Sequence, residues 1–336
     1  MGALSSSVLA ALLPARPARA AMRVTLAVGG RAAYAFRHLP LTVAAQLDFF
    51  RAEGVEITWL EFASDTLALQ AVQDGLADVG AMGYEATLRP QEGRPAVRSL
   101  VLQGRAPQLA LAVSARALPH FRSMEDLRRR RIGVNEFGSL SHAMASMALA
   151  QAGLRPDEVD FVAVGEGVGA LSALRSGKVH ALSHADPVMA RLEQKGEVRV
   201  VNDARSMAGA QALFGGLMPG GCLVATPQFL QKHANEAQAL ANGVVHALKW
   251  LQTAAPADIV RTVPPEQLMG DRGLYLLALA RVREAISPDG MMPDGGPETA
   301  LRVLSALDPA IAPRRPDLAR TYTQEFARKA KQKFSA

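Results

Sequence analysis

The sequence has little of what several common protein classes need. Its 336 residues include one cysteine, Cys222, so no intramolecular disulfide can form and no thiolate cluster can hold a metal ion. Aromatic residues make up 5% of the chain, and the formal net charge of +6 is spread along it, apart from the run Arg128–Arg131, which is typical of a solvated helix end. A nucleic-acid partner is therefore not expected, because its binding needs clustered cations and stacking rings.

Long apolar runs and catalytic motifs are also missing. Beyond residue 21 no apolar run reaches the ~18 residues that span a bilayer. The sequence contains no G-x-S-x-G, H-E-x-x-H or G-x-x-x-x-G-K-[ST] motif, and Gly165–Gly169 resembles a phosphate loop only loosely. His180 and His184 lie four apart, but on a predicted strand and its end rather than on one helix. We therefore expect neither a cofactor nor a metal ion.

The N-terminus has two of the three parts of a secretory leader. Residues 4–13 are apolar, and Ala18–Ala21 supplies small residues at an A-x-A cleavage site. The basic segment that usually precedes the apolar part is missing, so the alternative is the Ala/Pro-rich start of a cytosolic protein. We expect residues 1–20 to be a signal peptide cleaved after Ala20, which leaves a net charge of +4 because Arg16 and Arg19 are removed.

From residue 22 onward, short β-branched runs alternate with helical periodicity, which indicates open, mainly parallel α/β sheets covered by helices. The first series reads β-α-β-α-β, with strands at 24–28, 55–60 and 77–81 and helices at 41–53 and after the cap Ser64 or Asp65. A second series begins after residue 115, with strands at 131–134, 159–164, 179–183 and 198–201. The pattern therefore predicts two similar lobes.

After residue 220 the sequence becomes mainly helical. One strand at 222–225 is followed by amphipathic helices at 227–233, 237–253, 274–286, 297–307 and 317–331. A helical tail cannot easily form a third core, so we expect it to pack on the first lobe. That lobe is then discontinuous, with lobe one at 22–112 and 213–336, lobe two at 113–212, and two hinge strands near 111–115 and 206–215.

Candidate binding residues follow the predicted strands, because ligands gather beyond the carboxyl ends of open α/β sheets. Gly29 and Gly30 either let the backbone approach a ligand or form a plain turn, and Tyr34 follows them. Ser139 comes after Gly138 and opens a helix, where it is either an N-cap only or a cap that also holds an anion.

Further candidates lie at equivalent turns. Tyr84 and Glu85 follow the third strand, where the ring could stack on a ligand and the carboxylate could simply lie near a helix start. His142, in the first turn of its helix, is either a donor to an oxyanion or a wall residue. His184 and Asp186 follow a strand, and Asp186 before Pro187 is an ordinary helix cap.

Several segments together resemble a known family. The quoted stretches are LPLTVAAQLDFFRAEGVEITWLEF, LQAVQDGLADVGAMGYEATL, RIGVNEFGSLSHAMASMALAQAGLRPDEVDFVAVG, ALRSGKVHALSHADP and LANGVVHALKWLQTAAPADI. They are similar to the periplasmic solute-binding proteins of nitrate, sulfonate and taurine ABC importers, which are related to thiamine-precursor binding proteins. The resemblance covers residues 24–330 and implies a two-lobed, type II-like periplasmic binding protein fold. It also implies a monomer in the periplasm that delivers a cleft ligand to an ABC permease and its ATPase, without catalysis.

The resemblance also assigns cleft contacts and a ligand class. The contacts fall on Gly29, Gly30, Ser64, Asp65, Gly83, Tyr84, Glu85, Gly138, Ser139, Ser141, His142, His184 and Asp186. The expected ligand is a small organic anion such as a sulfonate or carboxylate, while the carboxylates also allow a zwitterion or a neutral nitrogen heterocycle. The alternative is a cofactor-free enzyme on the same fold, in pyrimidine or menaquinone-precursor metabolism, with His142 and Glu85 as the acid–base pair.

Overall fold

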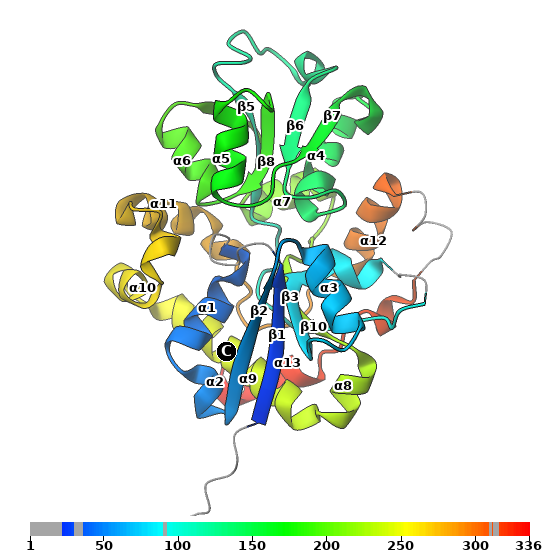
Figure 1. Cartoon of the computed structure of the whole chain (residues 1–336), viewed down its shortest axis with the longest axis vertical. Coiled ribbons are helices and arrows are strands. Elements are labelled where there is room, and N and C mark those ends of the chain that lie inside the picture. The colour runs from blue at the N-terminus through cyan, green and yellow to red at the C-terminus, as the bar shows by residue number, and fades with distance from the viewer. Residues whose placement is uncertain (1–21, 30–35, 90–92, 309–310, 312–315) are drawn as a thin grey trace, which may run out of the picture.

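The computed structural model describes residues 22–29, 36–89, 93–308, 311 and 316–336. The expected signal peptide and the candidates Gly30 and Tyr34 lie outside the described residues. The described chain forms two sheets with helices on their faces, one above the other in Figure 1. This confirms the two-lobed α/β fold expected from the sequence.

The sheet of the first lobe has the strand order β2-β1-β3-β10-β4. Strands β2 and β3 run parallel to β1 on either side of it, and β10 is antiparallel to both β3 and β4. The strand bounds are Met22–Gly29 (β1), Val55–Phe62 (β2), Val79–Gly83 (β3), Arg98–Leu102 (β4) and Gly221–Ala225 (β10). Helix α3 (Asp65–Gln73) follows β2 and packs on β1 and β3. The β-α-β-α-β opening is thus present.

The sheet of the second lobe has the equivalent order β7-β6-β8-β5-β9. Strand β6 is parallel to β7 and β8, while β5 is antiparallel to β8 and β9. The strand bounds are Leu109–Ser114 (β5), Arg131–Val134 (β6), Asp160–Ala163 (β7), Ala181–Ala185 (β8) and Val198–Ala204 (β9). The helices are α4 (Leu140–Gln151), α5 (Val168–Arg175), α6 (Val188–Gln194) and α7 (Met207–Phe214).

The first crossing between the sheets lies at a different position from the expected one, and the second, between β9 and β10, includes the expected segment but is not a strand. The first crossing is at residues 103–108, because the apolar run 109–114 is strand β5 of the second sheet. The second expected hinge strand, 206–215, is instead the helix α7. Ser206 caps this helix by accepting a hydrogen bond from the Gly209 backbone N–H, and Gly215 ends it with a left-handed φ of 68°.

The C-terminal helices pack mainly on the first sheet. Helix α9 (Ala234–Thr253) contacts β2 and β4, and α13 (Glu325–Phe334) packs on α9 and β4. The expected helix at 41–53 is two helices, α1 (Leu39–Gln46) and α2 (Phe49–Ala52), because Asp48 between them takes a left-handed φ of 56°. Both pack on α9.

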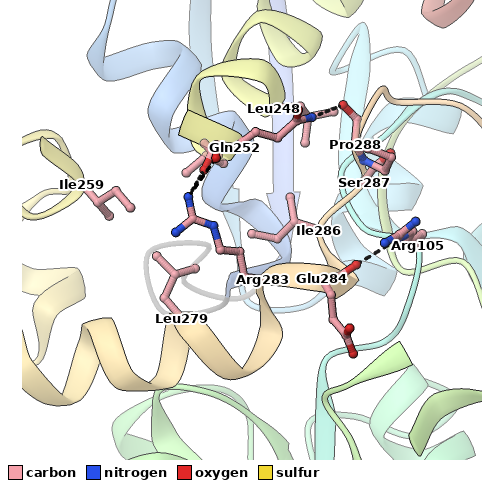
Figure 2. Close-up of a pocket in the computed structure, with 11 residues that line it drawn as sticks. Arg105, Leu248, Gln252, Ile259, Leu279, Arg283, Glu284, Ile286, Ser287 and Pro288 are labelled. Atoms are coloured by element: carbon pink, nitrogen blue, oxygen red, sulfur yellow. Dashed lines mark hydrogen bonds between the residues drawn. The ribbon is translucent and has the colours of Figure 1, made fainter. Parts of the chain in front are cut away.

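The remaining C-terminal helices are α8 (Pro227–Lys232), α10 (Pro256–Thr262), α11 (Arg272–Val282) and α12 (Gly296–Leu307). Helix α12 contacts α4 of the second lobe and α11 contacts α6, so the tail also reaches across the cleft between the lobes. Near the crossings, α9, α10 and α11 enclose a cavity shown in Figure 2. None of the helices in the described ranges is long and apolar enough to cross a membrane.

Candidate functional site

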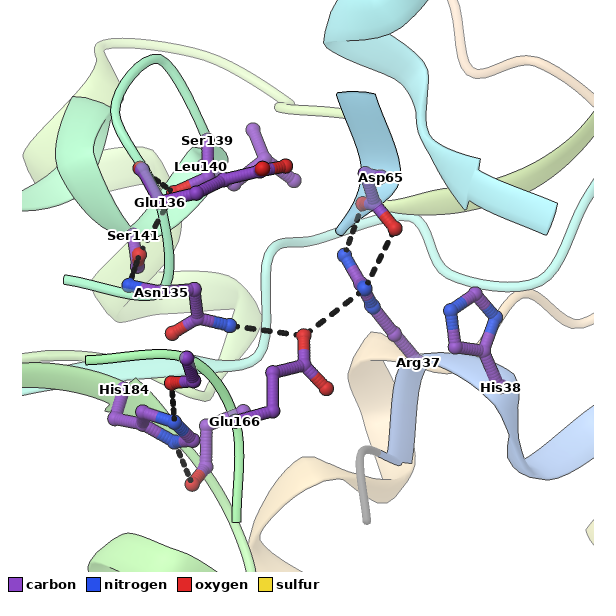
Figure 3. Close-up of polar contacts among 12 residues, drawn as sticks. Arg37, His38, Asp65, Asn135, Glu136, Ser139, Leu140, Ser141, Glu166 and His184 are labelled. Carbon is purple, nitrogen blue, oxygen red and sulfur yellow. Dashed lines mark hydrogen bonds and ion pairs between the residues drawn. The ribbon is translucent and has the colours of Figure 1, made fainter. Parts of the chain in front are cut away.

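A pocket lies between the two lobes, beyond the carboxyl ends of β2, β6 and β7 (Figure 3). The first lobe lines it with Arg37, Ala63, Ser64 and Asp65, and the second with Asn135, Glu136, Ser139, Gly165 and Glu166. Polar side chains fill most of the pocket and leave a volume of about 30 Å³. That is about the room of one water molecule.

Arg37 joins the two lobes by ion pairs. It lies in a short 3-10 helix (Phe36–His38), and its Nη1 and Nη2 donate to Asp65 Oδ2 at 2.8 Å and Oδ1 at 3.1 Å. This planar fork is the geometry in which arginine binds carboxylates best. The same Nη2 donates to Glu166 Oε1 of the second lobe at 3.0 Å, and that oxygen also accepts from Asn135 Nδ2 at 2.9 Å. Four polar side chains therefore form one chain across the cleft (Figure 3).

Negative charge exceeds positive charge around this pocket. Burial lowers the pKa of Arg37, but the carboxylates of Asp65 and Glu166 outweigh burial and hold that pKa above its usual range. Burial raises the pKa of Asp65 to about 7, because one arginine shared among several carboxylates does not offset the loss of water. Burial also raises the pKa of Glu85, again against the opposing effect of Arg37. The site thus holds one carboxyl group, that of Asp65, which titrates near neutral pH.

Glu85 occupies the position where the sequence predicts an anion. It lies in a 3-10 helix (Tyr84–Leu88) after β3, and its Oε1 accepts from the backbone N–H of Leu140, the first residue of α4, at 3.2 Å. Its carboxylate lies over Gly83, where an added Cβ would lie 2.0 Å from Glu85 Oε2. The N-terminus of α4 is therefore already in contact with a buried carboxylate of the protein itself.

Four buried atoms of the site have no hydrogen-bond partner within the described part of the chain. They are the acceptors Glu85 Oε2, Asn135 Oδ1 and Glu166 Oε2, and the donor Arg37 Nε. The Glu166 side chain is only 8% exposed, so water does not readily satisfy it. A buried polar group without a partner costs about 1–3 kcal/mol. A bound molecule that offers N–H donors to the three oxygens and an acceptor to Arg37 Nε would therefore stabilise the site.

The Ser139 hydroxyl binds its own turn. It donates to the Glu136 carbonyl at 2.7 Å, lies 2.8 Å from Ser141 Oγ and accepts from the His142 N–H at 3.4 Å. Ser141 Oγ accepts from the Asn135 N–H at 2.8 Å. Ser139 lines the pocket, whereas Ser141 is buried behind it, and together they hold Asn135 and Glu136 in place.

Two glycines make room for charged side chains rather than for a ligand. A Cβ on Gly29 would lie 2.3 Å from the Asp65 backbone nitrogen, so the end of β1 admits the start of α3 only without a side chain. Ser64 caps α3 by accepting from the Leu67 N–H at 3.2 Å and so orients Asp65. Gly138 has a φ of +84°, and a Cβ there would meet the Arg89 guanidinium.

Some predicted contacts lie away from the pocket. The Tyr84 ring is fully buried, with its hydroxyl 2.6 Å from Thr321 Oγ1, because β3 carries it into the first-lobe core. Asp186 points into the second lobe, where it accepts from the Ala190 N–H at 2.8 Å and pairs with Arg205 at 3.5 Å. His184 lies behind the pocket, with Nε2 3.3 Å from the Gly165 carbonyl oxygen.

The histidine proposed as a base has a structural contact instead. Its Nδ1 accepts from the Gly138 N–H at 3.0 Å, and its ring packs edge-on against Phe161 at 4.5 Å. Burial lowers the pKa of His142, and the nearby Arg89 lowers it further. Among the described contacts no hydrogen bond joins His142 to Glu85. No group of three or more His, Cys, Asp and Glu residues in the described ranges is placed to hold a metal ion.

Sequence reasoning missed the residues that join the lobes: Arg37, Asn135, Glu136 and Glu166. Three of them had a usable signal, because they are the first polar residues after β6 and β7, at the carboxyl ends where ligands gather. Glu166 lies between Gly165 and Gly167, both with positive φ, in the segment read as a poor phosphate loop. Arg37 had no comparable signal.

The comparisons with known proteins agree with this architecture. A family model described as NMT1/THI5 like matches residues 35–257. A protein from Bordetella bronchiseptica RB50 is 40% identical in sequence, with 94% of this chain and 98% of that chain covered and a TM-score of 0.87. The alkanesulfonate-binding protein SsuA from Xanthomonas axonopodis pv. citri, bound to MOPS, is 19% identical, with coverage of 91% and 100% and a TM-score of 0.69.

The periplasmic nitrate-binding protein NrtA from Synechocystis PCC 6803 is 11% identical, with 93% of this chain and 89% of that chain covered and a TM-score of 0.70. Among curated proteins no sequence matches. The two distant structures show a shared fold, and the family model spans more than half of the chain, which confirms the resemblance seen in the sequence. The chain therefore belongs to the NMT1/THI5-like family and has the two-lobed fold of periplasmic binding proteins.

Proposed function

We propose that this chain is the substrate-binding component of an ABC importer and holds a small zwitterion between its lobes. The observation that carries the proposal is the chain of contacts Asp65–Arg37–Glu166–Asn135, which joins a cation of one lobe to a carboxylate and an amide of the other. A ligand with an anionic and a cationic group can replace both partners of the contact between Arg37 and Glu166: its anionic group binds Arg37 and its cationic group binds Glu166. Binding then stabilises the closed arrangement of the lobes.

The charges of the pocket favour a zwitterion over a simple anion. The ligand's carboxylate or sulfonate would accept from Arg37, and its ammonium would donate to Glu166 and Asn135, whose remaining oxygens have no partner. A ligand with only an anionic group would add negative charge beside Asp65 and Glu166, which is unfavourable at low dielectric. A simple anion therefore needs Asp65 to be protonated, which its pKa of about 7 permits only at neutral pH and below.

A matched set of small molecules tests the ligand class. Taurine, ethanesulfonate and ethylamine share one skeleton, as do β-alanine, propionate and ethylamine. In calorimetric titrations we expect one of the two zwitterions to bind at least about tenfold more tightly than either single-group analogue. Arg37→Gln should weaken that binding by a similar factor. If ethanesulfonate or propionate binds as tightly as the matching zwitterion, the proposal of a zwitterionic ligand is wrong. If none of the compounds binds, the proposal that this pocket is the ligand site loses its support.

The proposal includes export and a permease partner. We expect mature protein from its native host to begin at Ala21, in the periplasm, as a monomer that docks on an ABC permease and its ATPase. N-terminal sequencing of the mature protein checks this. An intact Met1 on a cytoplasmic product would contradict it.

The proposed function involves no catalysis. The contact of His142 Nδ1 with the Gly138 N–H, together with the lack of a hydrogen bond between His142 and Glu85 among the described contacts, supports binding over the enzyme alternative. Purified protein should return the bound ligand chemically unchanged, as mass spectrometry of the released ligand would show. Conversion of the ligand would favour the enzyme instead.

A further inference from the structure

A second cavity lies in the first lobe, between α9, α10 and α11 (Figure 2). Its volume is about 210 Å³, and it shares no lining residue with the pocket between the lobes. The inner wall consists of five aliphatic side chains, each at least nine-tenths buried: Leu248, Leu251, Ile259, Leu279 and Ile286. An engineered cavity of about 150 Å³ with such walls binds benzene, so this one has room for a six-membered ring with one substituent.

Two guanidinium groups line the same cavity. Arg283 Nη2 donates to the carbonyl oxygens of Leu251 at 2.7 Å and Gln252 at 3.2 Å, and Arg105 Nε donates to the Glu284 carbonyl oxygen at 2.8 Å (Figure 2). The other side-chain N–H groups of both arginines have no partner among the described residues. Each guanidinium is thus held in place and still has donors to offer.

No carboxylate of the cavity neutralises these two cations. Glu284 is the acidic residue in the lining, and its Oε1 accepts from the Met207 backbone N–H at 2.7 Å, at the start of α7. Neither Arg105 nor Arg283 forms an ion pair within the described part of the chain. The cavity therefore combines an apolar interior with a positively charged edge.

The wall that carries the charged edge is built into the fold. The Arg105 N–H donates to the Ala285 carbonyl at 2.8 Å, and the Ser287 N–H donates to the Gln103 carbonyl at 2.9 Å. Gly104 forms a β-bridge with Ile286. These backbone contacts fix the segment 284–288 to the first crossing between the lobes, so the cavity is preformed.

We propose that this cavity is a second ligand site, for a small amphipathic oxyanion such as an aromatic or short branched carboxylate. The apolar part lies against Leu248, Ile259 and Leu279, and the carboxylate accepts from Arg105 and Arg283. The two arginines and the apolar walls together favour an amphipathic oxyanion over other ligands. A neutral ring makes no ionic contact with the arginines, and a small inorganic anion makes no contact with the apolar walls.

Benzoate is the probe, and benzamide is its neutral control. In NMR titrations of the full-length mature protein, benzoate should shift the amide signals of residues 248–252 and 283–288 and bind about tenfold more tightly than benzamide. Arg105→Met should reduce that preference to near unity. Arg272→Met removes the same charge from an exposed position on α11 outside the cavity and should leave it unchanged.

Two further variants separate this site from the pocket between the lobes. Ile259→Phe places a ring inside the cavity and should abolish the benzoate shifts, while Arg37→Gln should leave them intact. Benzoate shifts that are lost in Arg37→Gln and kept in Ile259→Phe would overturn the proposal, as would equal affinity for benzoate and benzamide. If Ile259→Phe does not fold, the location of the shifts in the unsubstituted protein decides: shifts confined to residues 135–139 and 165–166 would refute the second site.

Discussion

The ion pair between Arg37 and Glu166 should contribute measurably to the stability of the closed, two-lobed structure. The perturbation is a double-mutant cycle of Arg37→Gln and Glu166→Gln, since glutamine keeps the approximate shape and a hydrogen-bonding group at each position. Arg37 also binds Asp65, so its loss leaves two buried carboxylates without their shared cation. The two single substitutions should therefore have unequal effects.

The magnitude follows from distance and burial. The two charged atoms are 3.0 Å apart, and the side chains are 15% and 8% exposed. Breaking a buried pair by removing one partner costs about 3–5 kcal/mol, so we expect about 4 kcal/mol for Arg37→Gln. Glu166→Gln should cost only about 1 kcal/mol, because it also relieves repulsion with Asp65. Once Arg37 is gone, neutralising Glu166 becomes favourable, so the double variant should lose about 3 kcal/mol and the coupling energy should be about 2 kcal/mol.

Urea unfolding at pH 8 and low ionic strength measures the cycle, because Asp65, with a pKa of about 7, is then largely ionised. The exposed pair Arg23–Glu56, at 3.8 Å with side chains 85% and 58% exposed, is the matched control and should show no measurable coupling. If the effects of Arg37→Gln and Glu166→Gln add to within about 0.5 kcal/mol, the contact does not hold the lobes together and the reasoning fails.

Three other predictions test the supporting structure. Ser139→Ala should lower the free energy of unfolding by about 1 kcal/mol and Ser139→Gly by only a few tenths of a kcal/mol, since glycine is tolerated at an N-cap. Equal losses for the two variants in thermal unfolding would show that capping is not the role of Ser139. The pKa of Asp65 is about 7 in the folded protein and about 3.9 when unfolded, so its contribution to stability is fully present below about pH 4 and is lost as the pH rises through 7. Asp65→Asn should flatten the pH dependence of the free energy of unfolding in this range, and an unchanged slope would contradict the pKa assignment. Arg205→Met should destabilise the protein by about 3–5 kcal/mol because it leaves the buried Asp186 without its cation, and adding Asp186→Asn should restore part of the loss in the same denaturation assay. No recovery would mean that Arg205 acts through its other partners, Asp203 and Glu193.

The sequence by itself determined most of the local structure. Short β-branched runs predicted β1, β2, β6 and β7. Helix caps were predicted at Ser64 or Asp65 and at Ser139, and the structure has them at Ser64 and Ser139; capping depends only on residues three or four apart. The switch to long amphipathic helices after residue 220 predicted a tail that packs on the first lobe. Periodicity and caps are local signals, so they remain readable without any knowledge of the fold.

The incorrect predictions also came from local signals. The sequence predicts a hinge strand near 111–115, but most of this segment belongs to strand β5 of the second sheet, since a buried strand and a connecting strand have the same composition. The sequence predicts the second hinge strand at 206–215, but the Ser206 cap and the Gly215 end are those of a short helix. In both cases strand pairing, which joins residues far apart in sequence, decided the outcome.

Only the tertiary structure decided which side chains meet between the lobes. Arg37 and Glu166 are 129 positions apart, and their 3.0 Å contact exists because two crossings and the C-terminal helices place one sheet edge against the other. The same placement brings Glu85 to the N-terminus of α4. Tyr84 and Asp186 are instead buried within their own lobes, because the strands before them lead into the two cores. A sequence specifies which residues follow each strand, but the partner of a charge across a cleft depends on the relative position of two folded bodies, which no local pattern encodes.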